Sequence, residues 1–189
     1  MKQIRNYFEK SVIMPDDDWE LFASKLKIQT FSKKQHLIST GETENYLSFI
    51  EYGTVRFYIP REEDDFTFSF SFADNFVSAY DSFLTRKRCS YNIQALEETV
   101  LWRISYEDLN LIYAETEIGE KIGRLASERL YLENFKREIS LLTETAEERY
   151  LTLFTDQPHI LKYIPLKYIA SYIGITPQAL SRIRRRIIS

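Results

Sequence analysis

Cysteine, histidine and glycine are scarce in this chain of 189 residues, which has one, two and five of them respectively. The lone Cys89 excludes an intramolecular disulfide and a four-thiolate cluster, and His36 and His159 are not spaced as a pair of metal ligands. The few glycines form no phosphate-binding loop, and neither a Ser/His/Asp order nor a spaced pair of carboxylates is evident. We therefore expect no metal, no cofactor and no enzymatic activity.

Long apolar runs are absent as well. No apolar stretch approaches the roughly 18 residues that a membrane-spanning helix requires, and residues 1–10 lack the apolar segment of a signal peptide. We expect a cytoplasmic protein with no membrane partner. The hydrophobic content of 44%, with 13 Phe and 13 Tyr, is ample for a packed core in one large or two small domains.

Acidic residues disappear from the end of the chain. From Gln157 to Ser189 there is no Asp or Glu, whereas six basic residues are present: Lys162, Lys167, Arg182, Arg184, Arg185 and Arg186. The whole chain carries a formal charge of −3, so the first 156 residues carry −9. A basic end on an acidic body is typical of a phosphate-binding module, and it points to nucleic acid.

The same terminal segment has the pattern of two short helices around a tight turn. Apolar residues at helical spacing give each helix an inward face, formed by Leu166, Ile169, Ala170 and Ile173 in the first and by Leu180, Ile183 and Ile187 in the second. Gly174 can adopt the left-handed conformation that ends the first helix, and Thr176 with Pro177 suits the start of the second. The pattern predicts a helix-turn-helix motif.

The outward face of the second helix carries hydrogen-bonding side chains. Arginine can bind guanine bidentately and glutamine can bind adenine, so this face is suited to reading base edges. The candidate DNA-binding residues are Thr176, Gln178, Ser181, Arg182, Arg185 and Lys167. The alternative is a helical hairpin whose arginines form an ordinary solvated surface.

Short strands dominate the first part of the chain. The strand candidates are residues 28–31, 36–39, 46–50, 54–59, 66–72, 91–96 and 99–104, and a short helix is expected to begin after Pro15. In residues 66–72 phenylalanine alternates with Thr or Ser, and the charged residues 61–65 before them indicate an exposed hairpin turn. Roughly eight short strands at close spacing imply a compact antiparallel barrel or jelly roll.

Helical patterns take over from Ser105. Ser105 and Asp108 have the spacing of a capping box, and a longer helix is expected from Glu117 to about Leu142. Its apolar stripe consists of Ile118, Ile122, Leu125, Leu132 and Ile139. The stripe could pack on the protein's own core, but the apolar surface is wider than one seam. That width favours a helix that also pairs with a second copy of the chain.

A third helix, from Ala146 to about Phe154, leads into the basic end of the chain. The pattern as a whole predicts an α+β protein in three parts. Residues 1–115 are expected to form an antiparallel β-roll or jelly-roll barrel, residues 116–142 a long dimerisation helix, and residues 143–189 a helix-turn-helix domain of winged-helix type.

This order of parts resembles the Crp/Fnr family of bacterial transcription regulators, over nearly the whole chain. The most specific residues lie at 41–42, 51–53, 82–85, 94–99, 169–176 and 180–184. The resemblance implies a sensor barrel of the cyclic-nucleotide-binding type, a helix that pairs two subunits, and a second C-terminal helix that enters the major groove of a palindromic site. By position, Thr176 would contact a phosphate, while Gln178, Ser181 and Arg182 would face bases.

The resemblance also implies a ligand pocket, where the chain departs from the family. Members that bind cyclic AMP hold the ribose with the glutamate of a Gly-Glu pair and the phosphate with an arginine further along. Ser78 and Ala79 stand in place of the pair and Cys89 in place of the arginine, so we expect cyclic AMP not to bind. The candidate pocket residues are Ser78, Ala79, Tyr80, Arg88, Cys89, Ser90 and Tyr91. A shift of the loop would let Arg86 or Arg88 supply the phosphate ligand; otherwise these basic residues form a solvated loop tip.

The function hypothesis is a homodimeric, sequence-specific transcription regulator that binds double-stranded DNA. RNA polymerase and an unidentified small-molecule effector are further candidate partners. The alternative is a small-molecule or cyclic-nucleotide binding module that acts through protein contacts. The acid-free end of the chain and the hydrogen-bonding face of its last helix favour the first hypothesis.

Overall fold

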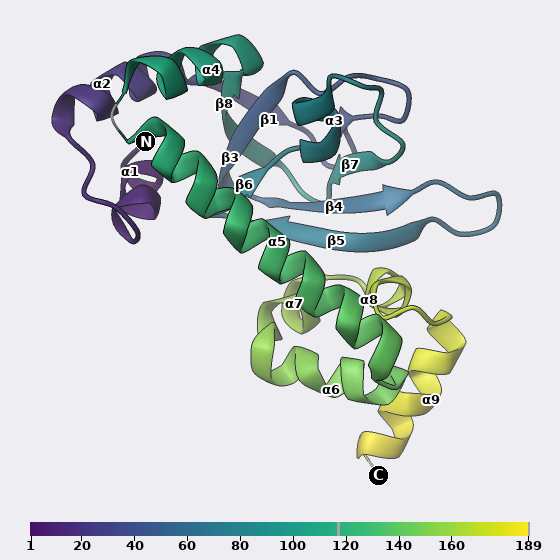
Figure 1. Cartoon of the computed structure of the whole chain (residues 1–189). Helices are drawn as coiled ribbons and strands as arrows, with labels where there is room; N and C mark the ends of the chain where they lie inside the picture. The colour runs from purple at the N-terminus through teal and green to yellow at the C-terminus, as the bar shows by residue number, and fades with distance from the viewer. Residues whose placement is uncertain (117, 189) are drawn as a thin grey trace. The chain divides into compact units, whose positions relative to one another are not determined.

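A computed structural model describes residues 1–116 and 118–188 of the chain (Figure 1). The chain divides into two compact units, which are Met1–Tyr58 with Phe70–Glu128, and Ile59–Ser69 with Arg129–Ser189. The expected start of the long helix at Glu117 lies outside the described residues. Within those residues, no helix combines the length and the apolar character needed to cross a membrane.

The first unit is built around two four-stranded sheets. The strand orders are β1-β8-β3-β6 and β2-β7-β4-β5. The strands are β1 (Lys27–Phe31), β2 (His36–Ile38), β3 (Tyr46–Tyr52), β4 (Thr54–Ile59), β5 (Phe66–Phe72), β6 (Phe76–Val77), β7 (Asn92–Ala95) and β8 (Thr99–Ser105). The pairings of β8 with β1 and β3, of β3 with β6, and of β7 with β2 and β4 are antiparallel. The predicted antiparallel barrel-like fold is confirmed.

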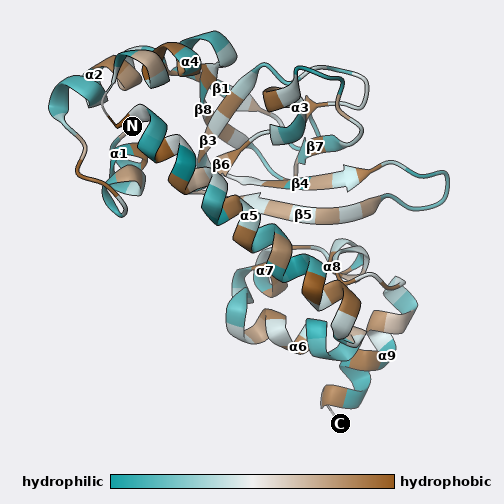
Figure 2. Cartoon of the chain, in the orientation of Figure 1, coloured by the Kyte–Doolittle hydropathy of each residue, from teal (hydrophilic) through white to brown (hydrophobic). Residues whose placement is uncertain are grey.

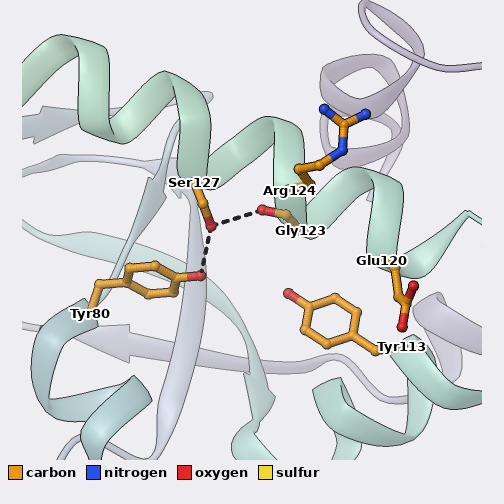
Figure 3. A pocket seen from close by; sticks show the side chains of 6 residues that line it. All are labelled: Tyr80, Tyr113, Glu120, Gly123, Arg124 and Ser127. Carbon is orange, nitrogen blue, oxygen red and sulfur yellow. Dashed lines mark hydrogen bonds between the residues drawn. The ribbon is translucent and has the colours of Figure 1, made fainter.

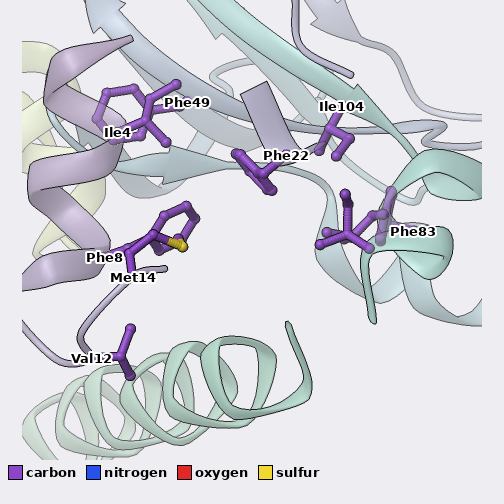
Figure 4. Packing of buried hydrophobic residues seen from close by; sticks show 10 residues of the cluster. Ile4, Phe8, Val12, Met14, Phe22, Phe49, Phe83 and Ile104 are labelled. Atoms are coloured by element: carbon purple, nitrogen blue, oxygen red, sulfur yellow. The ribbon is translucent and has the colours of Figure 1, made fainter. Parts of the chain in front are cut away.

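Side-chain alternation along β3 and β8 divides the core of this unit into two clusters. Phe49 and Ile104 belong to a cluster covered by helices, whereas Ile50 and Leu101 belong to a cluster shared with residues of the other sheet, such as Ile93. Successive residues of a strand face opposite sides of its sheet, so one sheet contributes to both clusters. Figure 4 shows the first cluster, in which side chains of the N-terminal helices surround Phe49.

In the described residues, five helices contribute to the first unit, two of them before β1, one between β6 and β7, and two after β8. They are α1 (Lys2–Glu9), α2 (Asp16–Ser24), α3 (Tyr80–Thr85), α4 (Tyr106–Glu115) and the start of α5 (Gly119–Thr143). α2 begins after Pro15 as predicted, and the hydroxyl of Ser105 accepts a hydrogen bond from the Asp108 amide at 3.1 Å, which confirms that cap. α1 was not predicted, although Ile4 and Phe8, spaced one turn apart, are both buried.

The second unit contains the rest of α5 followed by four helices and the tip of the β4–β5 hairpin. The helices are α6 (Ala146–Asp156), α7 (Pro158–Tyr163), α8 (Leu166–Tyr172) and α9 (Pro177–Ile188). Their common core consists of Tyr150, Leu153, Ile160, Ile164, Ile169, Ala170, Ile173 and Leu180. α7 was not predicted because Pro158 also suits the end of α6, yet it occupies the first position of a new helix, where a missing N–H is harmless.

Candidate functional site

α8 and α9 form the predicted helix-turn-helix. Ala170 on α8 is 0% exposed and Leu180 on α9 is 1% exposed, so the small side chain lies at the contact between the helices as expected. Gly174 adopts the left-handed conformation with φ of +81°, and the Thr176 hydroxyl accepts a hydrogen bond from the Ala179 amide at 3.2 Å. Leu166 and Ile187 depart from the prediction, because they are 43% and 36% exposed rather than turned inward.

The candidate DNA-binding side chains are accessible. Gln178, Ser181, Arg182 and Arg185 are all exposed, and their spacing places them on one side of α9, away from the buried Leu180. Thr176 at the start of α9 and Lys167 on α8 are exposed too. The neighbouring Arg186 differs from this set, since its guanidinium forms an ion pair with Glu147 of α6.

Two arginines that the sequence did not single out contact the turn of the motif. Arg137 of α5 donates from Nη2 to the carbonyl of Tyr172 at 2.7 Å, and Arg149 of α6 donates from Nε to the carbonyl of Ile173 at 3.0 Å. Both belong to the same unit as the motif. A sequence signal for Arg137 is lacking, because an arginine on a long, mostly exposed helix reads as a solvated residue.

The two halves of the apolar stripe on α5 differ in burial. Ile118, Ile122 and Leu125 pack, partly buried, against the helix-covered cluster of the first unit. Leu132 and Ile139 are 64% and 43% exposed. Leu130, Tyr131, Phe135, Leu141 and Leu142 are exposed as well, and Figure 2 shows such hydrophobic residues along the length of α5. The second half of the helix therefore presents a long apolar surface.

The candidate pocket residues differ in their surroundings. Ala79 and Cys89 are 0% and 2% exposed and belong to the apolar cluster shared by the two sheets. Arg88 and Ser90 are exposed, and the Ser78 hydroxyl donates to the carbonyl of Tyr46 at 2.9 Å. Burial raises the pKa of the Cys89 thiol, so the thiol carries no charge at neutral pH.

The buried carboxyl group of Glu44 contacts one of the candidate pocket residues, Ala79. One oxygen of Glu44 accepts from the amides of Asn45 and Tyr46, both at 3.0 Å, and the other from the amide of Ala79 at 3.4 Å. Arg103 Nη2 lies 3.8 Å from the same carboxylate, which is almost fully buried. Burial raises the pKa of Glu44, and it lowers the pKa of Arg103. The Glu44 carboxyl group therefore accepts from three backbone amides, one of them at the start of α3.

Arg86, the alternative phosphate ligand, is engaged within the protein. Its guanidinium donates to the Glu44 carbonyl at 2.6 Å and to Asn45 Oδ1 at 2.5 Å, and it lies 4.3 Å from the centre of the Tyr106 ring. Tyr91 is also engaged, because its hydroxyl donates to the Asp81 carboxylate at 2.5 Å. Freeing either group for a ligand would require breaking these contacts.

A shallow pocket of about 250 Å³ lies beside the first turns of α5 (Figure 3). Of the candidate pocket residues, Tyr80 lines it, and its hydroxyl lies 3.4 Å from that of Ser127. The other lining residues are Tyr113, Glu120, Gly123 and Arg124. In the described part of the chain, no group of three or more His, Cys, Asp or Glu side chains is placed to hold a metal ion.

Comparison with known proteins finds a family match for the strand-rich part of the chain. Residues 28–116 match the family of cyclic nucleotide-binding domains. The matched segment is slightly less than half of the chain. A search of the curated proteins gave no match.

Solved structures extend the likeness to the rest of the chain. A putative Crp/Fnr-family transcriptional regulator from Eubacterium rectale is 18% identical, with a TM-score of 0.72 over 96% of this chain and 87% of that one. FixK2 from Bradyrhizobium japonicum is 16% identical, with a TM-score of 0.70 over 86% and 84%. The c-di-GMP responsive regulator CLP from Xanthomonas campestris is 16% identical, with a TM-score of 0.68 over 92% and 91%. The chain has the fold of the Crp/Fnr transcription regulators.

Proposed function

We propose that this chain is a homodimeric, sequence-specific DNA-binding regulator of transcription rather than an enzyme. The observation that carries the proposal is the exposed side of α9, on which Gln178, Ser181, Arg182 and Arg185 share one face opposite the buried Leu180. A helix of this kind fits the major groove, where its polar side chains meet base edges. The absence of acidic residues after Asp156 removes repulsion from phosphates.

The residues divide into two roles. Arg182, Gln178 and Ser181 lie at positions suited to base edges, and Arg185 extends the same face. Thr176 and Lys167, at the start of α9 and on α8, suit contacts with the phosphate backbone. Both roles rest on exposure and position in the motif.

Dimerisation would proceed through the second half of α5. Leu132 and Ile139, one heptad apart and both exposed, lie on the apolar surface that a second copy of α5 would cover. Ile118, Ile122 and Leu125 instead hold the start of the helix to its own unit. A two-fold pair of helices would present two copies of α9 to a palindromic site.

The part before α5 would act as the sensor, with boundaries at residues 1–115, 116–142 and 143–189. CLP responds to c-di-GMP, but Ala79 and Cys89 in the core argue for an effector here that does not rely on the cyclic AMP contacts. RNA polymerase is the partner through which a bound dimer would act on transcription.

The test is selection of a preferred site by the purified full chain from random double-stranded DNA, followed by affinity measurements at several salt concentrations. Arg182→Ala should weaken binding to the selected site by about 1–3 kcal/mol per half-site while leaving weak, salt-sensitive binding to random DNA. Lys167→Ala is the matched comparison, and it should weaken both kinds of DNA alike and reduce the salt dependence. Failure of the wild-type chain to select any sequence would favour the binding-module alternative.

A further inference from the structure

Three elements of the second unit contact the last two residues of α8 and the residue that follows them. Ser171 contacts the hairpin tip through its hydroxyl, Tyr172 is contacted by Arg137 of α5, and Ile173 by Arg149 of α6. These three residues immediately precede Gly174, where the chain turns toward α9. The place and direction at which α9 begins are therefore set by contacts outside the motif.

The two arginines donate hydrogen bonds to carbonyl groups at the C-terminal end of α8. The last carbonyls of a helix lack partners within the helix and carry the negative end of its dipole, so a cation there is favourable. The guanidinium of Arg137 also stacks on the Tyr172 ring, with 3.9 Å between Cζ of the arginine and the centre of the ring. Arg149 bridges in addition to the carbonyl of Glu144, just beyond the end of α5.

Arg137 has a feature that Arg149 lacks, because it lies on the long helix. It is spaced five residues from Leu132 and two from Ile139, in the stretch of α5 with the exposed apolar surface. Tyr172 is 9% exposed, so the stack is almost closed to solvent. Burial lowers the pKa of Arg137, which nevertheless remains a cation at neutral pH.

We propose that Arg137 is the positioning residue through which α5 sets the orientation of α9 on DNA. The inference rests on the proposed function and adds a residue that touches neither bases nor phosphates. With two copies paired through α5, each Arg137 ties its own motif to the dimer axis. The distance and rotation between the two copies of α9, and hence the preferred spacing of the half-sites, depend on this contact.

The experiment uses a series of DNA duplexes in which the spacing between the two half-sites of the selected sequence changes by single base pairs. The affinity of the wild-type chain and of each protein variant is measured for every duplex. A contact of a charged guanidinium with a carbonyl is worth about tenfold in an equilibrium constant. For Arg137→Ala we expect the preference for the best spacing to fall by about that factor, with affinity for an isolated half-site unchanged. Arg137→Lys keeps a donor but loses the stack, and it should give an intermediate preference.

Arg124→Ala is the matched control, because it removes an arginine of α5 that is 60% exposed and pairs only within the helix to Glu128. It should leave the spacing preference unchanged. If the wild-type chain selects a sequence but Arg137→Ala and Arg137→Lys keep its spacing preference, the inference is wrong and the proposed function stands. If the wild-type chain selects no sequence, the proposed function itself fails. Should Arg137→Ala not fold, the lysine variant alone decides.

Discussion

The hydroxyl of Ser171 accepts a hydrogen bond from the amide of Thr67 at 2.8 Å and donates one to the carbonyl of Asp65 at 3.2 Å. β5 is the last strand in its sheet order, so its outer edge has no neighbouring strand. A side chain of the helix-turn-helix thus takes the place of a strand and satisfies backbone groups at the tip of the β4–β5 hairpin. The contact fixes this hairpin tip to α8 within one unit.

Ser171→Ala should loosen the hairpin tip. The alanine removes one acceptor from the Thr67 amide, and a hydrogen bond of this kind contributes about 1 kcal/mol net, or about fivefold in an opening equilibrium. We expect hydrogen exchange of the Thr67 amide, measured by NMR on the full chain, to accelerate by about that factor. Ser24→Ala is the control, because the Ser24 hydroxyl donates to the Leu21 carbonyl in α2. Equal exchange of Thr67 in all three proteins would mean that the hairpin is held by other contacts.

Leu132→Glu should convert the proposed dimer into monomers. Leu132 is 64% exposed in the single chain, and a two-fold pair of helices would bury two like charges at this seam without partners. Sedimentation at several protein concentrations measures the change. The control is Ile13→Glu, which adds the same charge at a side chain that is 93% exposed on the first unit and should leave the dimer intact. A dimer of undiminished strength in Leu132→Glu would locate the interface elsewhere.

The sequence predicts elements well where one local rule is sufficient. Short apolar runs between turn signals identified seven of the eight strands in the described residues. The caps at Ser105 and Thr176 were found from side chains that bond to the amide three residues further along. β6 was missed because it has two residues, too few to show a period. α1 was missed because only two of its eight residues are buried, which leaves little apolar stripe.

Some candidate site residues could likewise be identified from a local pattern, and others could not. The accessible face of α9 follows from helical spacing alone, so its residues could be identified from the sequence. The roles of Glu44 and Arg137 could not, since their partners Ala79 and Tyr172 lie 35 residues away in the chain in both cases. Such contacts depend on tertiary packing, and neither side chain belongs to a motif.

The capping box at the start of α6 predicts a pH effect. The Glu148 carboxylate accepts from the amide of Thr145 at 2.7 Å and from its hydroxyl at 2.8 Å, and these bonds lower the pKa of Glu148 below its ordinary value of 4.5. Because the folded state favours the charged form, the contribution to stability is present above pH 4.5 and is lost as the pH falls through the lowered pKa.

Thr145→Ala should therefore raise the pKa of Glu148 part of the way back, because the hydroxyl donor is lost and the amide donor remains. An NMR titration of the side-chain carboxyl resonances measures the shift. Glu133 is the internal reference, since it lies on α5 and pairs with Arg129 rather than with Thr145. An unchanged pKa of Glu148 in the variant would show that the amide alone is responsible.

Cyclic AMP should not bind the chain at micromolar concentration. The resemblance to the Crp/Fnr family aligns Ala79 and Cys89 with the ribose and phosphate ligands of its cyclic AMP-binding members. Both residues are buried in the apolar core, and the Glu44 carboxylate already accepts from the Ala79 amide. Each missing charge-assisted contact costs about 1.5–3 kcal/mol, so two losses weaken binding by orders of magnitude. Isothermal titration of the full chain with cyclic AMP and cyclic GMP is the measurement. A micromolar dissociation constant that Arg86→Ala or Arg88→Ala abolishes would mean that the basic loop supplies the phosphate ligand after rearrangement, and that the position assigned to Cys89 is wrong.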